Sequence, residues 1–477
     1  CAACAARLRA LLLGRSSKSS SGMTATMRRM QQRVDGTRIG ELQGVVAGAL
    51  EEARRLGAIQ AEVDANLQQG LTVNVRLGEV DTVEYQRDRG LGVTVYIGHR
   101  KGSASTADLA PAAVSATVAK ACTIARYTAD DPYSGLAEPG TLATNIPDLN
   151  LDHAWDIEPE DAVELARRCE AAGRAVDPRI TNSEGASVST HRGVHVYGNS
   201  LGFLAGFPSS SHTVSCALIA QAGSDMQRDY WYATARDPGE LGDVGQIGRR
   251  AGERAIERLG ARRLSTRRAP VLFVPEVARG VLGHMVAAIR GGNQYRRSSF
   301  LLDAAGRQIL PSFIQMHERP HIPKALASSP FDSEGVATRD RELIANGVLQ
   351  GYVLGSYAAR KLGLKSTGNA GGVHNLLVES DREACTFEGL LARMGAGLVV
   401  TELMGQGVNG VTGDYSRGAT GFWVEGGAFA FPVEEVTIAG NLRDMYLAID
   451  AIGSDVDLRG TIRCGSILIG EMTIAGG

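Results

Sequence analysis

Several patterns are scarce in this chain of 477 residues, and each scarcity excludes a class of protein. No run of 18 apolar residues is present, so the sequence predicts no membrane-spanning helix and no membrane partner. The cysteines number only seven, an odd count that argues against a disulfide framework and predicts a reducing, cytoplasmic location. Excess charge is also lacking, because 50 Lys plus Arg oppose 52 Asp plus Glu, and the formal charge of −2 predicts no nucleic-acid partner.

Glycine, by contrast, is abundant, with 59 of 477 residues, about 12%, against a usual content of about 7%. Because no collagen-like period accompanies it and prolines number only 15, this glycine indicates turns and bulges of β structure. Alternating apolar and polar residues predict antiparallel strands. Apolar residues at helical spacing predict helices over residues 39–56, 111–126, 159–175, 239–259 and 276–289. The expected fold class is α+β, with N-terminal and middle α/β units that carry antiparallel meanders and a large β-rich C-terminal domain.

Composition changes along the chain predict four segments. The first 34 residues hold seven basic residues and no acidic one, so residues 1–35 are expected to form a disordered N-terminal extension. Because the chain begins at Cys1 and offers Met23, we expect the true reading frame to extend upstream. The predicted boundaries of the remainder are 36–135 for an N-terminal domain, 145–262 for a central domain and 263–477 for the C-terminal domain.

The string from His317 to His321 matches H-E-x-x-H, the zinc-binding motif of many metallopeptidases. On a helix, the two histidines share one face and bind zinc while the glutamate acts as general base. Here Pro320 interrupts the string, and a proline inside a helix costs about 3 kcal/mol or more. The sequence therefore predicts a surface loop or a strand. A zinc site that uses His317, Glu318 and His321, with Cys464 as a further ligand, remains the alternative.

Two other literal matches are better explained as turns. Gly405, Gly407 and Gly410 fit the dinucleotide fingerprint G-x-G-x-x-G, but turn and strand residues follow where a helix is required. Ser200 lies in a G-x-S-x-G string, which joins a strand to a helix in α/β hydrolases. Strand-like residues flank Ser200 on both sides, so the string predicts the tip of a hairpin.

Long runs of the C-terminal third resemble a known family. SYAARKLGLKSTGNAGGVHN, LVVTELMGQGVNGVTGDYSRGATGFWVE and CGSILIGEMTIAGG are similar to the PmbA/TldE branch of the TldD/PmbA metallopeptidase family, and the resemblance extends from about residue 36 to the end. It implies a three-part subunit that acts with a TldD-like catalytic subunit on unfolded or flexible peptides, in peptide-antibiotic maturation and antitoxin degradation. A homodimer remains open.

The resemblance also identifies a degenerate catalytic helix. The TldD branch carries H-E-x-x-x-H on a helix, and a cysteine near the C-terminus completes its zinc ligands. In the matching segment, residues 275–293, Gly283 replaces the first histidine, His284 the glutamate and Ala288 the second histidine. Only Cys464 remains, whereas a catalytic zinc normally needs three protein ligands. We therefore expect no cofactor on this chain and expect the zinc to be bound by the TldD-like partner.

The role expected for this chain is therefore to bind and position a peptide. A strand-rich cleft can hold an extended peptide by edge pairing, and glycines allow its backbone to approach closely. The glycine-rich segment 366–375 is the candidate, although a plain β turn would use the same residues. The candidate peptide-binding residues are Ser366, Thr367, Gly368, Asn369, His374 and Asn375. A protein-binding regulator without a peptidase role remains a further alternative.

Overall fold

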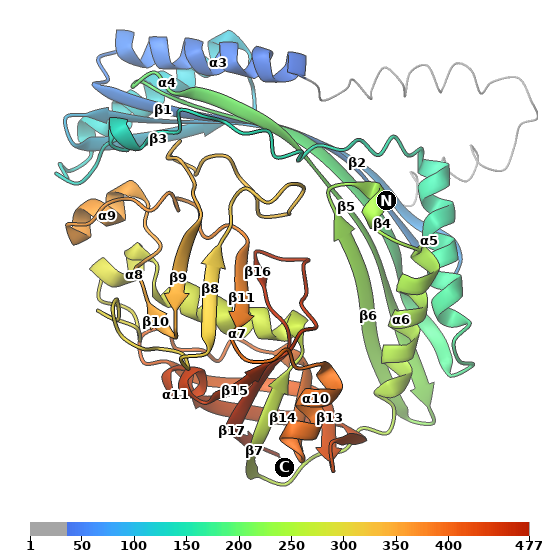
Figure 1. Cartoon of the computed structure of the whole chain (residues 1–477). Helices are drawn as coiled ribbons and strands as arrows, with labels where there is room; N and C mark the ends of the chain where they lie inside the picture. Colours follow the sequence, from blue (N-terminus) through green and yellow to red (C-terminus); the bar gives the residue numbers. More distant parts are fainter. Residues whose placement is uncertain (1–35, 477) are drawn as a thin grey trace, which may run out of the picture.

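One curved antiparallel sheet dominates the first half of the chain in this computed structural model, which describes residues 36–476 (Figure 1). Its strands lie in the order β3-β2-β1-β4-β5-β6. They are β1 (Gln60–Arg76), β2 (Glu79–Ile97), β3 (Arg100–Thr106), β4 (Ile180–Asn199), β5 (Leu204–Ala222) and β6 (Asp225–Ala235). Since β1 pairs with β4, the expected N-terminal and central domains share this sheet. The extension predicted for residues 1–35 lies outside the described residues.

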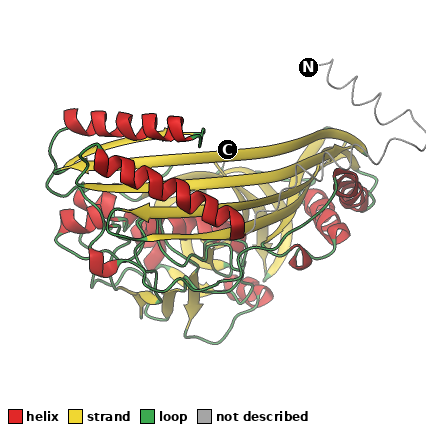
Figure 2. Ribbon diagram, turned by 90° about the horizontal axis from the view of Figure 1, so that it is seen from above, coloured by secondary structure: helices red, strands yellow, loops and turns green. Residues whose placement is uncertain are grey.

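Helices cover the outer, convex face of the sheet, and Figure 2 shows two of them lying over the long strands. They are α3 (Gly36–Arg55), α4 (Pro111–Tyr127), α5 (Pro159–Arg174) and α6 (Val244–Glu257). The pair α3 and α4 shares one apolar core with the sheet, which includes Val46 and Val63. The pair α5 and α6 shares a second core, which includes Val188 and Leu218. The sheet therefore has a core beneath each helix pair.

The C-terminal half, residues 263–476, contains two sheets that lie within the curve of the first sheet (Figure 1). The larger is barrel-like, because β14 pairs with β17 and so closes the ring β14-β13-β12-β7-β17. Its strands are β7 (Arg267–Phe273), β12 (Gly397–Met404), β13 (Asp414–Glu425), β14 (Ala428–Asn441), β15 (Ile449–Ile452) and β17 (Ile467–Ala475). The smaller sheet consists of β8 (Ile314–Glu318), β9 (Arg341–Ala345), β10 (Val348–Leu349), β11 (Leu376–Ser380) and β16 (Ile462–Arg463).

Helix α7 (Pro275–Ala288) buries Val281, Leu282 and Met285 in a core to which both C-terminal sheets contribute. The other helices of this half are α8 (Gly291–Tyr295), α9 (Ser356–Leu362), α10 (Phe387–Met394) and α11 (Leu442–Leu447). No helix among residues 36–476 is long and apolar enough to cross a membrane. This architecture confirms the expected α+β class with a β-rich C-terminal domain.

The helices predicted from periodicity are confirmed, with one boundary corrected. The helix predicted over 239–259 begins five residues later, at Val244. Residues Pro238–Glu240 instead form a short 3-10 turn, and the Asp243 carboxylate accepts from the Gly245 N–H to cap α6. An aspartate before the first helical residue is a preferred N-cap. The strand residues His317 and Glu318 and the turn at 405–413 agree with the predicted absence of helix there.

Aromatic rings and arginines join the curved sheet to the C-terminal half. Tyr197 of β4 and Phe331 belong to one buried apolar cluster at this interface. The Arg236 guanidinium lies nearly buried and donates to two carbonyl oxygens of the C-terminal half. Arg360 on α9 donates in the opposite direction, to three carbonyl oxygens that precede α5. These contacts fix the position of the sheet above the loops that carry the candidate site.

Close packing of α5 against α6 generates a test of this architecture. A Cβ added at Gly248 would lie 1.8 Å from the Cys169 carbonyl oxygen, so Gly248→Ala must push the helices apart. We expect the free energy of unfolding to fall by about 1–3 kcal/mol, with a lower melting temperature in circular dichroism. The control is Gly44→Ala on α3, where a Cβ meets nothing within 4 Å and should stabilise by up to about 1 kcal/mol. Equal melting temperatures for the two variants would contradict the packing.

Candidate functional site

The degenerate motif positions lie on α7. Ala288 is buried, whereas Gly283 and His284 lie on the partly exposed side of the helix. The His284 ring meets the edge of the Tyr415 ring, with 6.1 Å between centroids. Burial, and then the nearby Arg417 charge, lower the pKa of His284. A Cβ at Gly283 would meet no heavy atom within 4 Å, so the helix face is open where the resemblance places a zinc-binding histidine in the TldD branch.

Cys464, the remaining ligand position, is fully buried in the core of the C-terminal half. Burial, together with the Asp457 carboxylate, raises the pKa of the Cys464 thiol to about 12, so the thiolate that binds zinc is disfavoured. Among residues 36–476, no group of three or more His, Cys, Asp or Glu side chains is arranged to hold a metal ion. The residues present on and around α7 therefore do not fit a catalytic zinc.

The H-E-x-x-H string does not form a ligand set either. His317 and Glu318 are adjacent on β8, and successive side chains of a strand point to opposite faces. His317 lies 3.6 Å from Glu342 and 3.5 Å from a second surface carboxylate. His321 lies in the following turn, where its Nε2 is 2.9 Å from the Thr338 hydroxyl. The three residues thus have separate partners.

Glu318 instead anchors the loop at residues 366–375. Its side chain is 2% exposed, and its Oε2 accepts from Arg341 Nε at 2.6 Å. Its Oε1 accepts from Asn369 Nδ2 at 2.7 Å and from the backbone N–H of His374 at 2.6 Å. Asn375, at the end of the loop, is fully buried and donates to a carbonyl and a hydroxyl of a neighbouring segment. One carboxylate thereby holds both ends of the segment 369–374.

The first three residues of the candidate segment, residues 366–368, are also held by contacts within this chain. The Ser366 and Thr367 hydroxyls both donate to the Leu354 carbonyl, at 3.3 and 3.2 Å. Gly368 has a φ of +72°, and a Cβ there would lie 2.6 Å from the Ala337 carbonyl oxygen, so glycine is required. The six candidate residues therefore shape the loop, and two of them also line cavities: His374 lines one, and Asn369 lines another.

Residues 370–372 line two cavities of about 350 Å³ each, and among the three Gly371 is exposed whereas Gly372 is buried. We call the first the ring cavity, because His195, Phe207 and Phe331 line it. The second, the helix cavity, lies beside α8 and α9 and includes Tyr295 in its wall. The ring cavity is bounded by the curved sheet on one side and the C-terminal half on the other. The loop at residues 366–375, which its glycines mark in the sequence, therefore faces the interface between the curved sheet and the C-terminal half.

An acidic cavity of about 270 Å³ adjoins the helix cavity and shares Glu334 with it. Burial raises the pKa of Glu62 in its wall, although the hydroxyls of Tyr197 and Tyr96 donate to that carboxylate. Burial likewise raises the pKa of the neighbouring Asp332 to about 7, against three backbone N–H donors. No sequence pattern marks these carboxylates, because Glu62 and Glu334 lie in different halves of the chain.

The Glu318 network generates a stability prediction. In Glu318→Gln, the Arg341 guanidinium loses its compensating charge, and the new amide N–H₂ faces other donors. We expect the free energy of unfolding to fall by about 3–5 kcal/mol and hydrogen exchange to accelerate in residues 369–374. Glu342→Gln on the neighbouring strand is the control, since that carboxylate is 56% exposed and should matter by less than about 0.5 kcal/mol. Wild-type melting and exchange in Glu318→Gln would refute the anchoring role.

Three family models match the chain in succession. The PmbA/TldA metallopeptidase domain 1 matches residues 61–125, the central domain matches residues 152–259 and the C-terminal domain matches residues 266–476.

Individual relatives agree with these matches. Metalloprotease PmbA of Escherichia coli O157:H7 is 51% identical over 416 residues, 87% of this chain and 92% of the relative. The Metalloprotease PmbA homolog of Haemophilus influenzae is 46% identical over 459 residues, 96% of this chain and the whole relative. A crystal structure from Bacteroides thetaiotaomicron, described as a candidate modulator of DNA gyrase, superposes with a TM-score of 0.86 at 27% identity and covers 92% of this chain and 99% of its own. The chain therefore belongs to the PmbA/TldE branch of the PmbA/TldD metallopeptidase family.

Proposed function

We propose that this chain is the TldE-like subunit of a two-subunit peptidase, in which it binds and positions unfolded or flexible peptides while a TldD-like partner carries the catalytic zinc. The observation that carries the proposal is the face of α7, where Gly283, His284 and Ala288 supply no set of zinc ligands. A peptidase-family fold without such ligands retains the surface that holds the peptide and needs a partner for the hydrolytic step.

The cavities around residues 370–372 support a peptide as the ligand. Gly371 is exposed and lines both the ring cavity and the helix cavity, so its backbone N–H and C=O are the groups with which an extended peptide can form main-chain hydrogen bonds. Cavities of 270–350 Å³ accommodate individual side chains, and a folded domain would not fit. This size favours unfolded or flexible peptides, such as the peptide-antibiotic precursors and antitoxins implied by the resemblance, in the cytoplasm.

Reconstitution tests the division of labour. We expect this chain to co-purify with its TldD-like partner and the pair to cleave casein or a flexible peptide. Each subunit alone should be at least about tenfold slower, because neither holds both the zinc and the complete peptide site. The assay follows peptide fragments by mass spectrometry. Cleavage by this chain alone would refute the proposal. A stable complex that leaves cleavage unchanged would favour the regulator, and a functional homodimer would appear as activity without the partner.

Metal analysis tests the alternative of a self-sufficient zinc peptidase. The native chain should contain well under one zinc per molecule, and the double variant His317→Ala, His321→Ala should contain the same amount, because those side chains have separate partners. The measurement is elemental analysis of protein purified without an affinity tag that binds metal. Stoichiometric zinc that disappears in the double variant would establish the alternative.

A further inference from the structure

A second polar cavity lies between the curved sheet and the C-terminal half and shares no lining residue with the three cavities already described. It has a volume of about 290 Å³ and is enclosed by β6, α6, α7, β12 and β13. Arg254, Arg279 and Arg417 line it, and we call it the arginine cavity. Gly280 of the degenerate catalytic helix also forms part of its wall.

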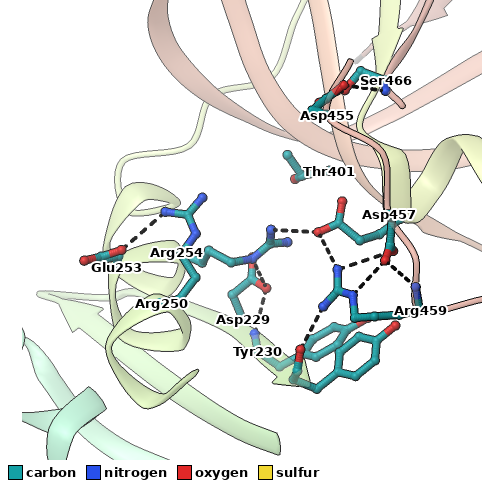
Figure 3. A network of polar contacts seen from close by, with 12 residues as sticks. Asp229, Tyr230, Arg250, Glu253, Arg254, Thr401, Asp455, Asp457, Arg459 and Ser466 are labelled. Atoms are coloured by element: carbon teal, nitrogen blue, oxygen red, sulfur yellow. Dashed lines mark hydrogen bonds and ion pairs between the residues drawn. The ribbon is translucent and has the colours of Figure 1, made fainter. Parts of the chain in front are cut away.

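The arginines of α6 are paired with carboxylates. Arg254 donates to Asp229 at 3.1 Å and lies 3.9 Å from Glu276 (Figure 3). Arg258 binds Asp229 at 3.3 Å and Glu402 at 2.7 Å. Both guanidinium groups are largely buried, and Asp229 is 5% exposed. Buried charges are stable when they are paired in this way, so neither arginine is available to a ligand without breaking its pair.

The arginines of the C-terminal half that approach Tyr232 are paired as well. Arg279 donates to Asp457 at 3.3 Å and to the Tyr232 hydroxyl at 2.9 Å. Arg459 donates to Asp457 at 2.9 Å, as Figure 3 shows, and it stacks on the rings of Trp231 and Tyr232 at 4.4 Å each. The four arginines 254, 258, 279 and 459 thus share the four carboxylates of residues 229, 276, 402 and 457.

A fifth arginine, Arg417, also lines the arginine cavity, and it differs from the other four because it has no carboxylate partner among the described residues. In the described part of the chain, its Nε is buried without a hydrogen-bond partner, and the ion pairs around the cavity do not include it. Its neighbour Tyr415 is buried and uncharged, and the Tyr415 hydroxyl contacts the Arg417 side chain without supplying a charge. Burial lowers the pKa of His284, which disfavours a second positive charge there. A buried donor without a partner costs about 1–3 kcal/mol, which a ligand would recover. The five arginines and the four carboxylates in and around the cavity therefore leave one positive charge without a carboxylate partner, that of Arg417.

We infer that the arginine cavity binds one carboxylate of a peptide through the guanidinium group of Arg417. A guanidinium presents a planar fork of N–H donors that fits a carboxylate, and one excess positive charge matches a monoanion. The hydroxyl of Thr401 supplies a further donor, because its hydrogen bond to a neighbouring carbonyl is long, at 3.4 Å. On α7, a Cβ at Gly280 would meet no heavy atom within 4 Å, which leaves room for the ligand in the cavity that Gly280 lines.

The source of the carboxylate is the C-terminus of the peptide or an Asp or Glu side chain, and both have the same chemistry. Tyr230 lines the cavity and is 41% exposed, so its ring lies where a peptide would enter. This inference rests on the proposed function, since it adds a charge preference to a peptide-binding subunit. It also gives α7 a role, because Gly280 on this helix and Arg417 line the same cavity.

Three fluorescent peptides of one flexible, uncharged sequence test the inference by anisotropy with the full chain. The first has a free C-terminal carboxylate, the second is amidated, and the third is amidated with a single internal Glu. We expect the first or the third to bind about tenfold more tightly than the second, which is the effect of one charge-assisted pair, and the tighter of the two identifies the source.

Variants connect that preference to the cavity. Arg417→Gln should bind all three peptides with the affinity of the neutral one, whereas Arg268→Gln, at a side chain that is 70% exposed, should keep the preference. If Arg417→Gln does not fold, Gly280→Leu fills the cavity from α7 and should also abolish the preference, while Ala287→Leu on the same helix should not.

The inference is overturned if the native chain binds the three peptides equally or if the preference survives both cavity variants. Equal binding would leave the proposed function intact, whereas no binding by any peptide, together with no cleavage by the reconstituted pair, would overturn both.

Discussion

The pairing of β1 with β4 is the interaction on which the rest of this structure depends. It runs from Glu62 opposite Asn199 to Val75 opposite Ala186, and it makes one sheet from two segments that lie far apart in the chain. Because side chains alternate along a strand, Val63 packs beneath the helices while Glu62 faces the C-terminal half. A shift of one residue in this register would exchange those faces. The walls of the acidic cavity and the cores of the helices are therefore set by a single pairing.

The balance of positive and negative side chains at the interface between the curved sheet and the C-terminal half differs from one cavity to another. Near the loop at 366–375, carboxylates are in excess, and burial raises the pKa of both Glu62 and Asp332. Near the start of α7, five arginines meet four carboxylates, and Arg417 is the one without a carboxylate partner among them. Buried charge is expensive unless it is paired, so each imbalance marks a place where a ligand gains more than it would at a balanced interface.

Local sequence patterns predicted the positions of the helices well, but they did not predict which strands pair or which residues a buried charge binds. Helical periodicity located α3, α4, α5 and α7 to within a few residues, because apolar spacing is a property of neighbouring residues. The Asp243 cap was overlooked, which placed the start of α6 too early.

The partners of a strand or a buried charge are not local properties. Glu318 binds residues 23, 51 and 56 positions away, and no spacing rule connects them. The glycines at 371 and 372 did indicate a loop beside a cavity, but the candidate side chains around them serve mainly to hold that loop. A string that matched a zinc motif by its letters thus turned out to contain the anchor of the loop.

Helix α7 places most of the residues that hold it in the core and two of the three zinc-motif positions on different sides. The residues that hold it in the core, such as Val281, Leu282 and Met285, lie on the buried side, whereas Gly283 and His284 lie on the partly exposed side. Gly283 and His284 can therefore vary without disturbing the core, whereas Ala288, the third motif position, is itself buried in the core. On the side of α7 that faces the arginine cavity, Gly280 forms part of the wall, and a Cβ there would meet no heavy atom within 4 Å. In the function that we propose, peptide binding depends on the cavities at the interface and not on zinc ligands of α7.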